Sequence, residues 1–145
     1  MRLMTDYFAY GSNMSESQMM RRCPQASLAG KATLAGHDFL INGSGFATIV
    51  PEAQTTVFGL LWTLSDSDIL SLDEYEGIDA GHYVKERRAV LFNGQTVMAM
   101  VYIATDSNPG VPERSYLESI VDAASAHRLP PDYVRRLAGW LSPPA

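Results

Sequence analysis

The sequence predicts an α+β domain with a mostly antiparallel sheet, either open or closed into a small barrel. Several β-rich segments follow one another along the chain, which favours antiparallel neighbours. The dipeptide at residues 93–94, Asn-Gly, is a strong hairpin signal between two of these segments. Segments with helical spacing interrupt and follow the strands. The 145 residues fit one domain, residues 1–145.

The N-terminal segment predicts a strand, a turn and a helix. Residues 3–10 form a short strand rich in aromatic side chains, and Gly-Ser-Asn at residues 11–13 breaks it. Ser15 begins a capping-box pattern and is the expected N-cap of a helix. The helix runs to about Cys23, because the proline that follows ends it.

The middle of the chain predicts more strands and a second helix. Residues 26–41 contain strand and turn material, and residues 46–50 and 55–64 are rich in β-branched and aromatic side chains. Ser65 begins a helix with acidic residues in its first turn. Gly77 is a plausible left-handed residue at its C-terminal end.

The last third predicts a hairpin and two helices. Strands at residues 83–92 and 96–105 flank the Asn-Gly turn. Pro112 suits a first helical turn, and another helix follows the proline pair at residues 130–131. The side chains expected to be buried at helical spacing are Leu117, Ile120, Val121 and Ala124 in the first helix, and Tyr133, Leu137, Trp140 and Leu141 in the second.

Composition narrows the classes of function. Eleven Lys and Arg against sixteen Asp and Glu give a net charge of −5, which argues against a nucleic-acid groove. One cysteine excludes an internal disulfide and a multi-cysteine metal site. The longest apolar stretches are strand-length, and the N-terminus lacks the pattern of a secretory signal. We therefore expect a cytoplasmic protein that does not enter a membrane.

The turn of Tyr10, Gly11, Ser12 and Asn13 is the first candidate site. A turn between a strand and a capped helix can direct several backbone N–H groups at one point, which suits an oxyanion or a carboxylate. The alternative is a tight connection that merely needs glycine, since strand-turn-helix corners are common.

The acidic cluster at residues 73–76 is the second candidate site. Three carboxylates crowd the negative end of a predicted helix, where acids are disfavoured. Such a departure from local preference is typical of functional sites, and the helix field would raise the proton affinity of a general base. Glu76 directly precedes Gly77 and can face a cleft, while Asp73 could help to orient the site. The alternative is a solvated acidic helix end.

The tyrosines and histidines are weaker indications of a functional site than the turn and the acidic cluster. Tyr10, Tyr83, Tyr102 and Tyr116 could line a pocket, or could simply pack in the core with satisfied hydroxyls. The three histidines lie far apart in the sequence and form no ligand-spaced pair, so a metal site is not expected.

Motifs along nearly the whole chain closely resemble those of the gamma-glutamylcyclotransferase-like family. The opening motif and the Glu-Gly motif are the specific ones, whereas the hydrophobic strands add little. The resemblance rests on Tyr7-Phe8-Ala9-Tyr10-Gly11-Ser12-Asn13-Met14, Gly45-Phe46-Ala47-Thr48-Ile49, Val57-Phe58-Gly59-Leu60-Leu61-Trp62, Leu72-Asp73-Glu74-Tyr75-Glu76-Gly77, Gly81-His82-Tyr83 and Leu129-Pro130-Pro131-Asp132-Tyr133.

This resemblance implies a small β-barrel with flanking helices and an enzyme that needs neither cofactor nor metal. The implied reaction cleaves a γ-glutamyl amide by attack of the substrate's own α-amine, releasing 5-oxoproline and a free amine. Glu76 matches the catalytic glutamate and would act as general acid/base. The backbone of Tyr10, Gly11, Ser12 and Asn13 matches the loop that holds the γ-glutamyl group, and the matching pocket tyrosines are Tyr83, Tyr102 and Tyr116.

Several functional alternatives stay open at the level of sequence. The expected partner is a small γ-glutamyl molecule, and a γ-glutamylamine or a biosynthetic γ-glutamyl-protected compound is as compatible as a γ-glutamyl amino acid. Only residues 42–44 separate Ile41 from Gly45, where glutathione-pathway members often carry a longer loop, so the leaving amine is not defined. A non-catalytic binding protein for the same ligands is a further alternative. The oligomeric state, monomer or homodimer, is not predicted.

Overall fold

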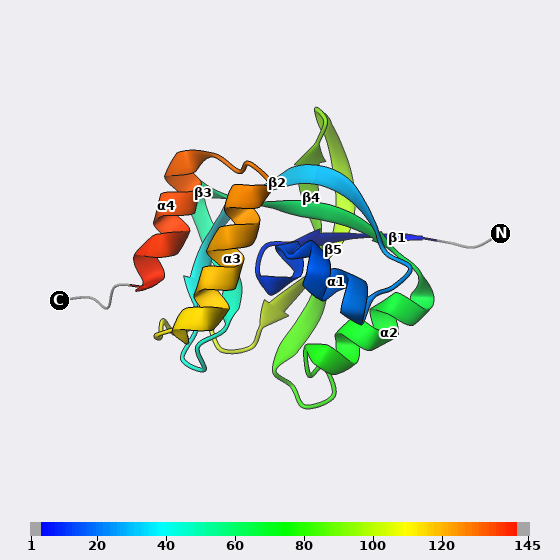
Figure 1. Cartoon of the computed structure of the whole chain (residues 1–145), viewed down its shortest axis with the longest axis horizontal. Helices are drawn as coiled ribbons and strands as arrows, with labels where there is room; N and C mark the ends of the chain where they lie inside the picture. The colour runs from blue at the N-terminus through cyan, green and yellow to red at the C-terminus, as the bar shows by residue number, and fades with distance from the viewer. Residues whose placement is uncertain (1–3, 142–145) are drawn as a thin grey trace.

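A closed β-barrel with the strand order β1–β3–β2–β4–β5 forms the centre of the computed structural model, which describes residues 4–141 (Figure 1). The predicted α+β class and the mostly antiparallel barrel with flanking helices are confirmed. The strands are β1 (Thr5–Ala9), β2 (Ser27–Ile41), β3 (Ala47–Leu64), β4 (Tyr83–Phe92) and β5 (Gln95–Ala104). The helices are α1 (Glu16–Arg22), α2 (Asp66–Tyr75), α3 (Arg114–Ala126) and α4 (Pro131–Ala138), with short 3-10 turns η1 (Ser12–Met14) and η2 (Gly139–Leu141).

The long hairpin β2–β3 supplies most of the barrel wall. The sequence predicted two strands at residues 46–50 and 55–64, but β3 is one continuous strand. The gap between the two predicted segments contains Pro51, which cannot donate a ladder hydrogen bond. Pro51 is exposed and lies opposite His37. Between the pair Ala35–Thr56 and the pair His37–Pro51, β2 advances by two residues and β3 by five. This irregularity lets the strand continue past the proline.

The short strand β1 closes the barrel. It pairs antiparallel with β3 from Thr5 opposite Leu64 to Ala9 opposite Leu60. Its other edge meets β5 in a parallel bridge between Tyr7 and Met100. Because β1 and β5 run in the same direction, both end at the same end of the barrel.

The helices cover the barrel on two sides (Figure 1). Leu117, Ile120 and Ala124 of α3 are buried, as predicted. Val121 is only half-buried, because it lies about 100° around the helix from Ile120. In α4 the predicted Tyr133 and Leu137 are buried.

Two side chains predicted to continue the buried face of α4 are only half-buried. Trp140 and Leu141 follow the end of α4 at Ala138 and belong to η2, so they leave the helical register. Among residues 4–141, no helix is both long enough and apolar enough to cross a membrane.

Helix α2 has well-defined ends, and these place the acidic cluster. Ser65 and Asp68 form a complete capping box at the N-terminal end. At the other end, the helix stops at Glu76 and the chain turns at Gly77 with a φ of 66°. Hydrogen bonds from Gly77 N–H to Glu74 O and from Ile78 N–H to Asp73 O complete a Schellman motif. The predicted helix start and left-handed glycine are therefore confirmed.

Gly59 tests how tightly β1 is packed against β3. A β-carbon at Gly59 would lie 2.3 Å from the carbonyl oxygen of Ala9. We predict that Gly59→Ala lowers the free energy of unfolding by about 3 kcal/mol, because backbone rather than a flexible side chain must move. Gly139→Ala is the control, since nothing lies within 4 Å of its β-carbon position. Equal thermal melting of the two variants would contradict the tight packing.

Candidate active site

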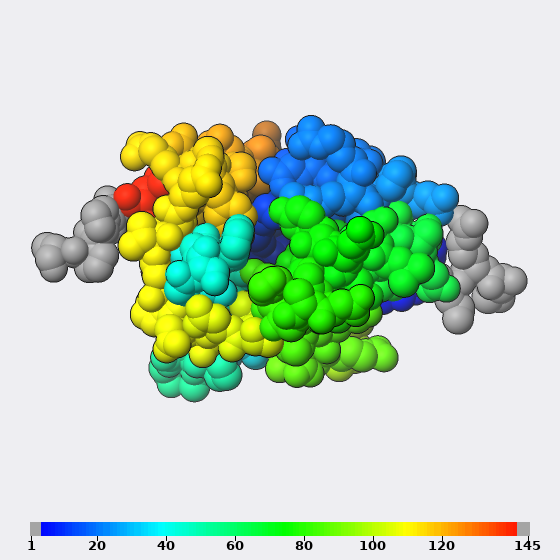
Figure 2. Space-filling model, turned by 90° about the horizontal axis from the view of Figure 1, so that it is seen from below, coloured from blue at the N-terminus to red at the C-terminus, as the bar shows by residue number. Residues whose placement is uncertain are grey.

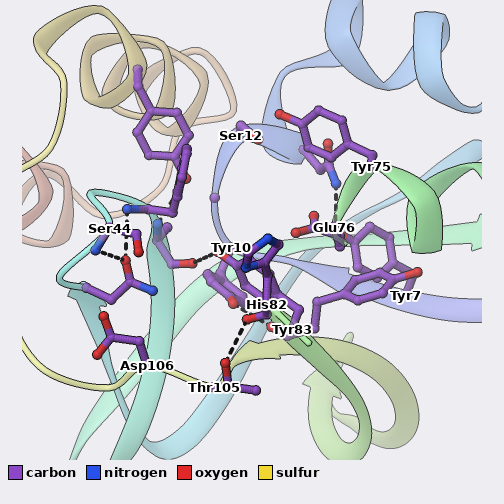
Figure 3. A pocket seen from close by; sticks show the side chains of 17 residues that line it. Tyr7, Tyr10, Ser12, Ser44, Tyr75, Glu76, His82, Tyr83, Thr105 and Asp106 are labelled. Atoms are coloured by element: carbon purple, nitrogen blue, oxygen red, sulfur yellow. Dashed lines mark hydrogen bonds between the residues drawn. The ribbon is translucent and has the colours of Figure 1, made fainter. Parts of the chain in front are cut away.

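A cavity of about 410 Å³ opens at the end of the barrel where β1, β2 and β5 end and β3 and β4 begin. Its size is typical of a small-molecule site. Figure 2 shows its mouth as a recess between the cyan, green and yellow segments, with blue N-terminal residues at its floor. It is lined by Tyr7, Tyr10, Gly11, Ser12, Asn13, Asn42, Ser44, Phe46, Ala47, Tyr75, Glu76, His82, Tyr83, Tyr102, Thr105, Asp106 and Tyr116 (Figure 3).

The loop of Tyr10, Gly11, Ser12 and Asn13, hereafter the 10–13 loop, forms one wall. A β-carbon at Gly11 would lie 3.2 Å from that of Ala47, so this wall leaves little room for a side chain there. The N–H of the next residue, Met14, donates to Gly11 O. Within residues 4–141, the N–H groups of Gly11, Ser12 and Asn13 donate to no acceptor of the chain. These three donors are therefore available to a ligand.

Glu76 also lines the cavity, at the C-terminal end of α2 beside Tyr75 (Figure 3). Burial raises the pKa of its carboxyl group to about 7, and the guanidinium of Arg22 opposes this rise. The sequence predicted a raised proton affinity from the field of the helix end, whereas the largest cause is desolvation. A carboxyl group of this kind exchanges protons near neutral pH.

The hydroxyl groups of three cavity tyrosines donate hydrogen bonds to other residues of the chain. Tyr83 donates to Ala47 O at 2.7 Å, and Tyr10 donates to Tyr102 O at 2.5 Å. Tyr102 donates to the carboxylate of Asp73 at 2.7 Å. These three rings therefore shape the cavity, and their hydroxyl protons are already used.

Tyr7 and Tyr116 differ, because each hydroxyl oxygen accepts a hydrogen bond. Tyr7 accepts from Asn13 Nδ2 at 2.9 Å, and Tyr116 accepts from Ala47 N–H at 3.0 Å. Burial raises the pKa of Tyr116 to about 12 and that of Tyr7 well above its usual value. Both side chains are thus neutral, and no acceptor among residues 4–141 is bonded to either hydroxyl hydrogen.

Known proteins of similar sequence and structure share this architecture. A profile of the AIG2-like family matches residues 56–137. Gamma-glutamylcyclotransferase of Mus musculus is 31% identical over 144 residues, covering 90% of this chain and 76% of that protein. The Homo sapiens gamma-glutamylcyclotransferase is 30% identical over 142 residues, again covering 90% of this chain and 76% of that protein. A solved structure named gamma-glutamyl cyclotransferase has a TM-score of 0.87 at 28% identity and covers 94% of this chain and 87% of that one.

The chain belongs to this AIG2-like, gamma-glutamylcyclotransferase-like family. It is therefore an enzyme of the gamma-glutamylcyclotransferase type. The eight residues that the sequence singled out lie around one cavity in this member of the family. They are Tyr10, Gly11, Ser12, Asn13, Glu76, Tyr83, Tyr102 and Tyr116. Their roles in binding and catalysis stay predictions.

Asp73 lies behind the cavity wall of this gamma-glutamylcyclotransferase-like chain and does not line the cavity. One carboxylate oxygen accepts from Tyr102, and the other forms an ion pair with Lys85 at 2.8 Å. Asp73 thus holds the ring of Tyr102 from outside, which agrees in kind with the orienting role that its spacing suggested.

Sequence reasoning missed a second half of this family member's cavity. The residues not singled out are Tyr7, Asn42, Ser44, Phe46, Ala47, Tyr75, His82, Thr105 and Asp106. Most lie on the loop after β2 and in the segments beside β4 and β5, which meet only when the barrel closes. Polar side chains directly after two strands, at Asn42 and Asp106, were the available signal. The Asp106 carboxylate accepts from Gly43 N–H at 3.0 Å and so joins these two loops.

Burial of Glu76 should have a measurable cost in stability. Its pKa is about 7 in the folded chain against 4.5 without the fold. The folded state therefore binds more protons between these values, so the free energy of unfolding falls as pH rises through that window. We predict that Glu76→Gln relieves this cost, and that its stability gain over the unsubstituted protein grows by about 2 kcal/mol between pH 5 and pH 8.

Denaturant unfolding at the two pH values measures this difference. Glu74→Gln is the matched control, since Glu74 is an exposed carboxylate on the same helix. A gain for Glu76→Gln that is the same at both pH values would show that Glu76 titrates normally.

Proposed function

We propose that the protein cleaves a γ-glutamyl amide by cyclisation. The α-nitrogen of the γ-glutamyl group forms a bond to its own γ-carbonyl carbon, and the bond from that carbon to the leaving nitrogen breaks. The α-ammonium group first loses one proton to solvent, which leaves the free amine that attacks. A second proton then moves from this nitrogen to the departing nitrogen, which leaves as a neutral amine. The products are 5-oxoproline and a free amine or amino acid. The observation that carries this proposal is that Glu76 shares one cavity with the free N–H groups of the 10–13 loop.

The reaction needs no nucleophile from the protein, because the attacking nitrogen is already tethered to the carbonyl. Holding the two in a near-attack geometry can supply on the order of 7–11 kcal/mol in favourable intramolecular cases. The rigid tyrosine wall suits this task, since Tyr10, Tyr83 and Tyr102 are each fixed by a hydrogen bond to the protein. The cavity then has to manage one proton and one developing negative charge.

Glu76 fits the proton transfer. As a carboxylate it takes a proton from the α-nitrogen as the free amine attacks, and as a carboxylic acid it gives that proton to the departing nitrogen. A pKa of about 7 makes both steps accessible near neutral pH.

The 10–13 loop fits the developing charge. Backbone N–H groups that are already oriented stabilise an oxyanion without reorganisation. The free N–H groups of Gly11, Ser12 and Asn13 are the available donors, and they also suit the substrate's α-carboxylate. The neutral hydroxyls of Tyr7 and Tyr116 can add O–H donors at the cavity wall.

We predict that Glu76→Gln lowers the rate of 5-oxoproline formation by about 10²- to 10⁴-fold, because the amide keeps the shape but cannot carry the proton. The substrates are a panel of γ-glutamyl dipeptides and γ-glutamylamines, and mass spectrometry follows 5-oxoproline. Glu74→Gln, which alters an exposed carboxylate two residues earlier, should retain the full rate.

Near-normal turnover by Glu76→Gln would remove Glu76 from the proton transfer. Binding of the same compounds without any turnover by the unsubstituted protein would favour a non-catalytic binding protein.

A γ-glutamylamine is the second candidate substrate, favoured by the charge of the cavity. In Figure 3, Ser44 and Asp106 lie away from Glu76 and Tyr75, across the cavity. Among the described residues, the side chains that line the cavity include Glu76 and Asp106 but no Lys or Arg. A leaving group with its own carboxylate would therefore meet no Lys or Arg side chain in the wall, where His82 is the one basic side chain among the described residues.

This predicts a preference between two substrates that differ by a single carboxylate. We expect γ-glutamyl-ethylamide to have a higher kcat/KM than γ-glutamyl-alanine by roughly tenfold, and Asp106→Asn to narrow this ratio. Glu52→Asn, an exposed acid on β3, is the control and should leave the ratio unchanged. A higher kcat/KM for γ-glutamyl-alanine would support the amino-acid substrate instead.

A further inference from the structure

Arg22 links the two halves of the cavity although it does not line it. It is the last residue of α1, and its guanidinium reaches across to the 10–13 loop and to the end of α2. It donates to Ser12 Oγ at 3.3 Å and also to Asn13 Oδ1. Its central carbon lies 3.5 Å from the centre of the Tyr75 ring. Three elements separate in the fold thus meet on one side chain.

The contacts of Arg22 differ from those of an ordinary surface arginine. Across residues 4–141, no carboxylate lies within ion-pair distance of its guanidinium, and Arg21, Arg87 and Arg128 also lack such a partner. What distinguishes Arg22 is that its guanidinium is nevertheless bonded and stacked on three side chains. The partners of Arg22 are a hydroxyl, an amide oxygen and an aromatic face. A planar guanidinium can bond in its plane and stack on a ring at the same time, which an ammonium group cannot do.

Through Asn13, Arg22 orients the 10–13 loop. Asn13 is 3% exposed, and its amide oxygen accepts from Arg22. This leaves the amide nitrogen facing Tyr7, to whose hydroxyl it donates at 2.9 Å. Arg22 therefore defines which way the Asn13 amide points, and with it the hydrogen-bonding state of Tyr7.

Through Tyr75, Arg22 also holds the end of α2. Tyr75 is 51% exposed, and its ring lies against the Arg22 guanidinium. The next residue is Glu76, and the stacked guanidinium restrains the backbone from which that carboxyl group projects. The two groups that the proposed reaction brings together are thus attached to the same cation.

The charge of Arg22 acts on Glu76 as well. It lowers the pKa of Glu76 against the effect of burial. Five tyrosines that interact electrostatically with Glu76 are neutral at physiological pH: Tyr7, Tyr10, Tyr83, Tyr102 and Tyr116. His82 and Asp106 are the other titratable side chains among the described residues that line the cavity with Glu76 and Tyr75.

We propose that Arg22 is a positioning residue that fixes the 10–13 loop against the Glu76 end of α2 and brings its positive charge to that end of the helix. This inference rests on the proposed cyclisation. It assigns to Arg22 no contact with the substrate, since Ser12, Asn13 and Tyr75 lie between it and the cavity.

The test compares Arg22→Gln and Arg22→Lys with Arg21→Gln, which removes an exposed arginine one residue earlier on the same helix. The probe is γ-glutamyl-alanine or γ-glutamyl-ethylamide, whichever the unsubstituted protein converts faster, and kcat/KM is measured from pH 5 to pH 9. We expect Arg22→Gln to lower kcat/KM roughly tenfold at pH 7 and less at pH 9. The acid limb of its pH profile, where kcat/KM falls as pH is lowered, should move to higher pH. Arg21→Gln should stay within about twofold.

Arg22→Lys separates charge from geometry. We expect it to restore the position of the acid limb but only part of the rate, because the ammonium group keeps the charge and loses the planar contacts. Should Arg22→Gln fail to fold, Tyr75→Leu removes the stacking face and leaves both hydrogen bonds and the charge of Arg22 in place. It should show a smaller loss of kcat/KM, with the acid limb of the pH profile unmoved. Arg22→Gln could instead lower kcat/KM by the same factor at every pH, and Arg22→Lys by that factor too. This result would overturn the proposal in favour of a purely structural role.

A readout without turnover distinguishes failure of this inference from failure of the proposed function. The carboxyl carbon of Glu76 is titrated by NMR, with its signal assigned from its absence in Glu76→Gln. Arg22→Gln should raise the midpoint by about half a pH unit or more. An unmoved midpoint overturns the role of Arg22, whereas a raised midpoint in a protein that converts no γ-glutamyl compound overturns the cyclisation alone.

Discussion

Insertion of β1 between β3 and β5 is the constraint on which the cavity depends. The strand is only five residues long, yet it pairs with β3 on one edge and meets β5 on the other. Its end delivers the 10–13 loop to the same end of the barrel as the starts of β3 and β4. Gly59 allows the close approach, because its missing side chain makes room for the backbone of Ala9. Without this closure, the loop and Glu76 would share no cavity.

Burial raises the pKa of Glu76 towards neutrality, and the same burial lowers the stability of the fold. A carboxyl group at the end of a helix with a left-handed glycine after it could have been fully solvated and strongly acidic. Here the cavity wall removes water from it and raises its pKa towards neutrality, while Arg22 limits the rise. The same desolvation that suits a proton carrier lowers the stability of the fold above the pKa, a trade-off that is common at active sites.

The tyrosines divide into two groups that sequence alone could not separate. Tyr10, Tyr83 and Tyr102 use their hydroxyl protons within the protein, whereas Tyr7 and Tyr116 accept hydrogen bonds there. Only the second group has an O–H donor to spare. The direction of each bond depends on partners far away in sequence, such as Ala47 for Tyr116. A residue type therefore predicted the wall of the cavity but not the function of each hydroxyl.

Local sequence determined the features that depend on neighbours in the chain. Ser65 and Gly77 set the ends of α2, and the Asn-Gly pair set the β4–β5 hairpin, because caps and tight turns are short-range. The family motifs pointed to Glu76 and the 10–13 loop.

Tertiary structure alone decided the rest. Continuity of β3 past Pro51 involves an irregular register with β2, in which β3 contributes the extra residues. The half-buried state of Trp140 followed from where α4 stops. The contribution of Asp106, Phe46 and Arg22 to the site arises from barrel closure, which joins segments far apart in the chain. Periodicity and residue spacing describe one segment at a time, so they do not predict contacts between segments that are far apart in the sequence.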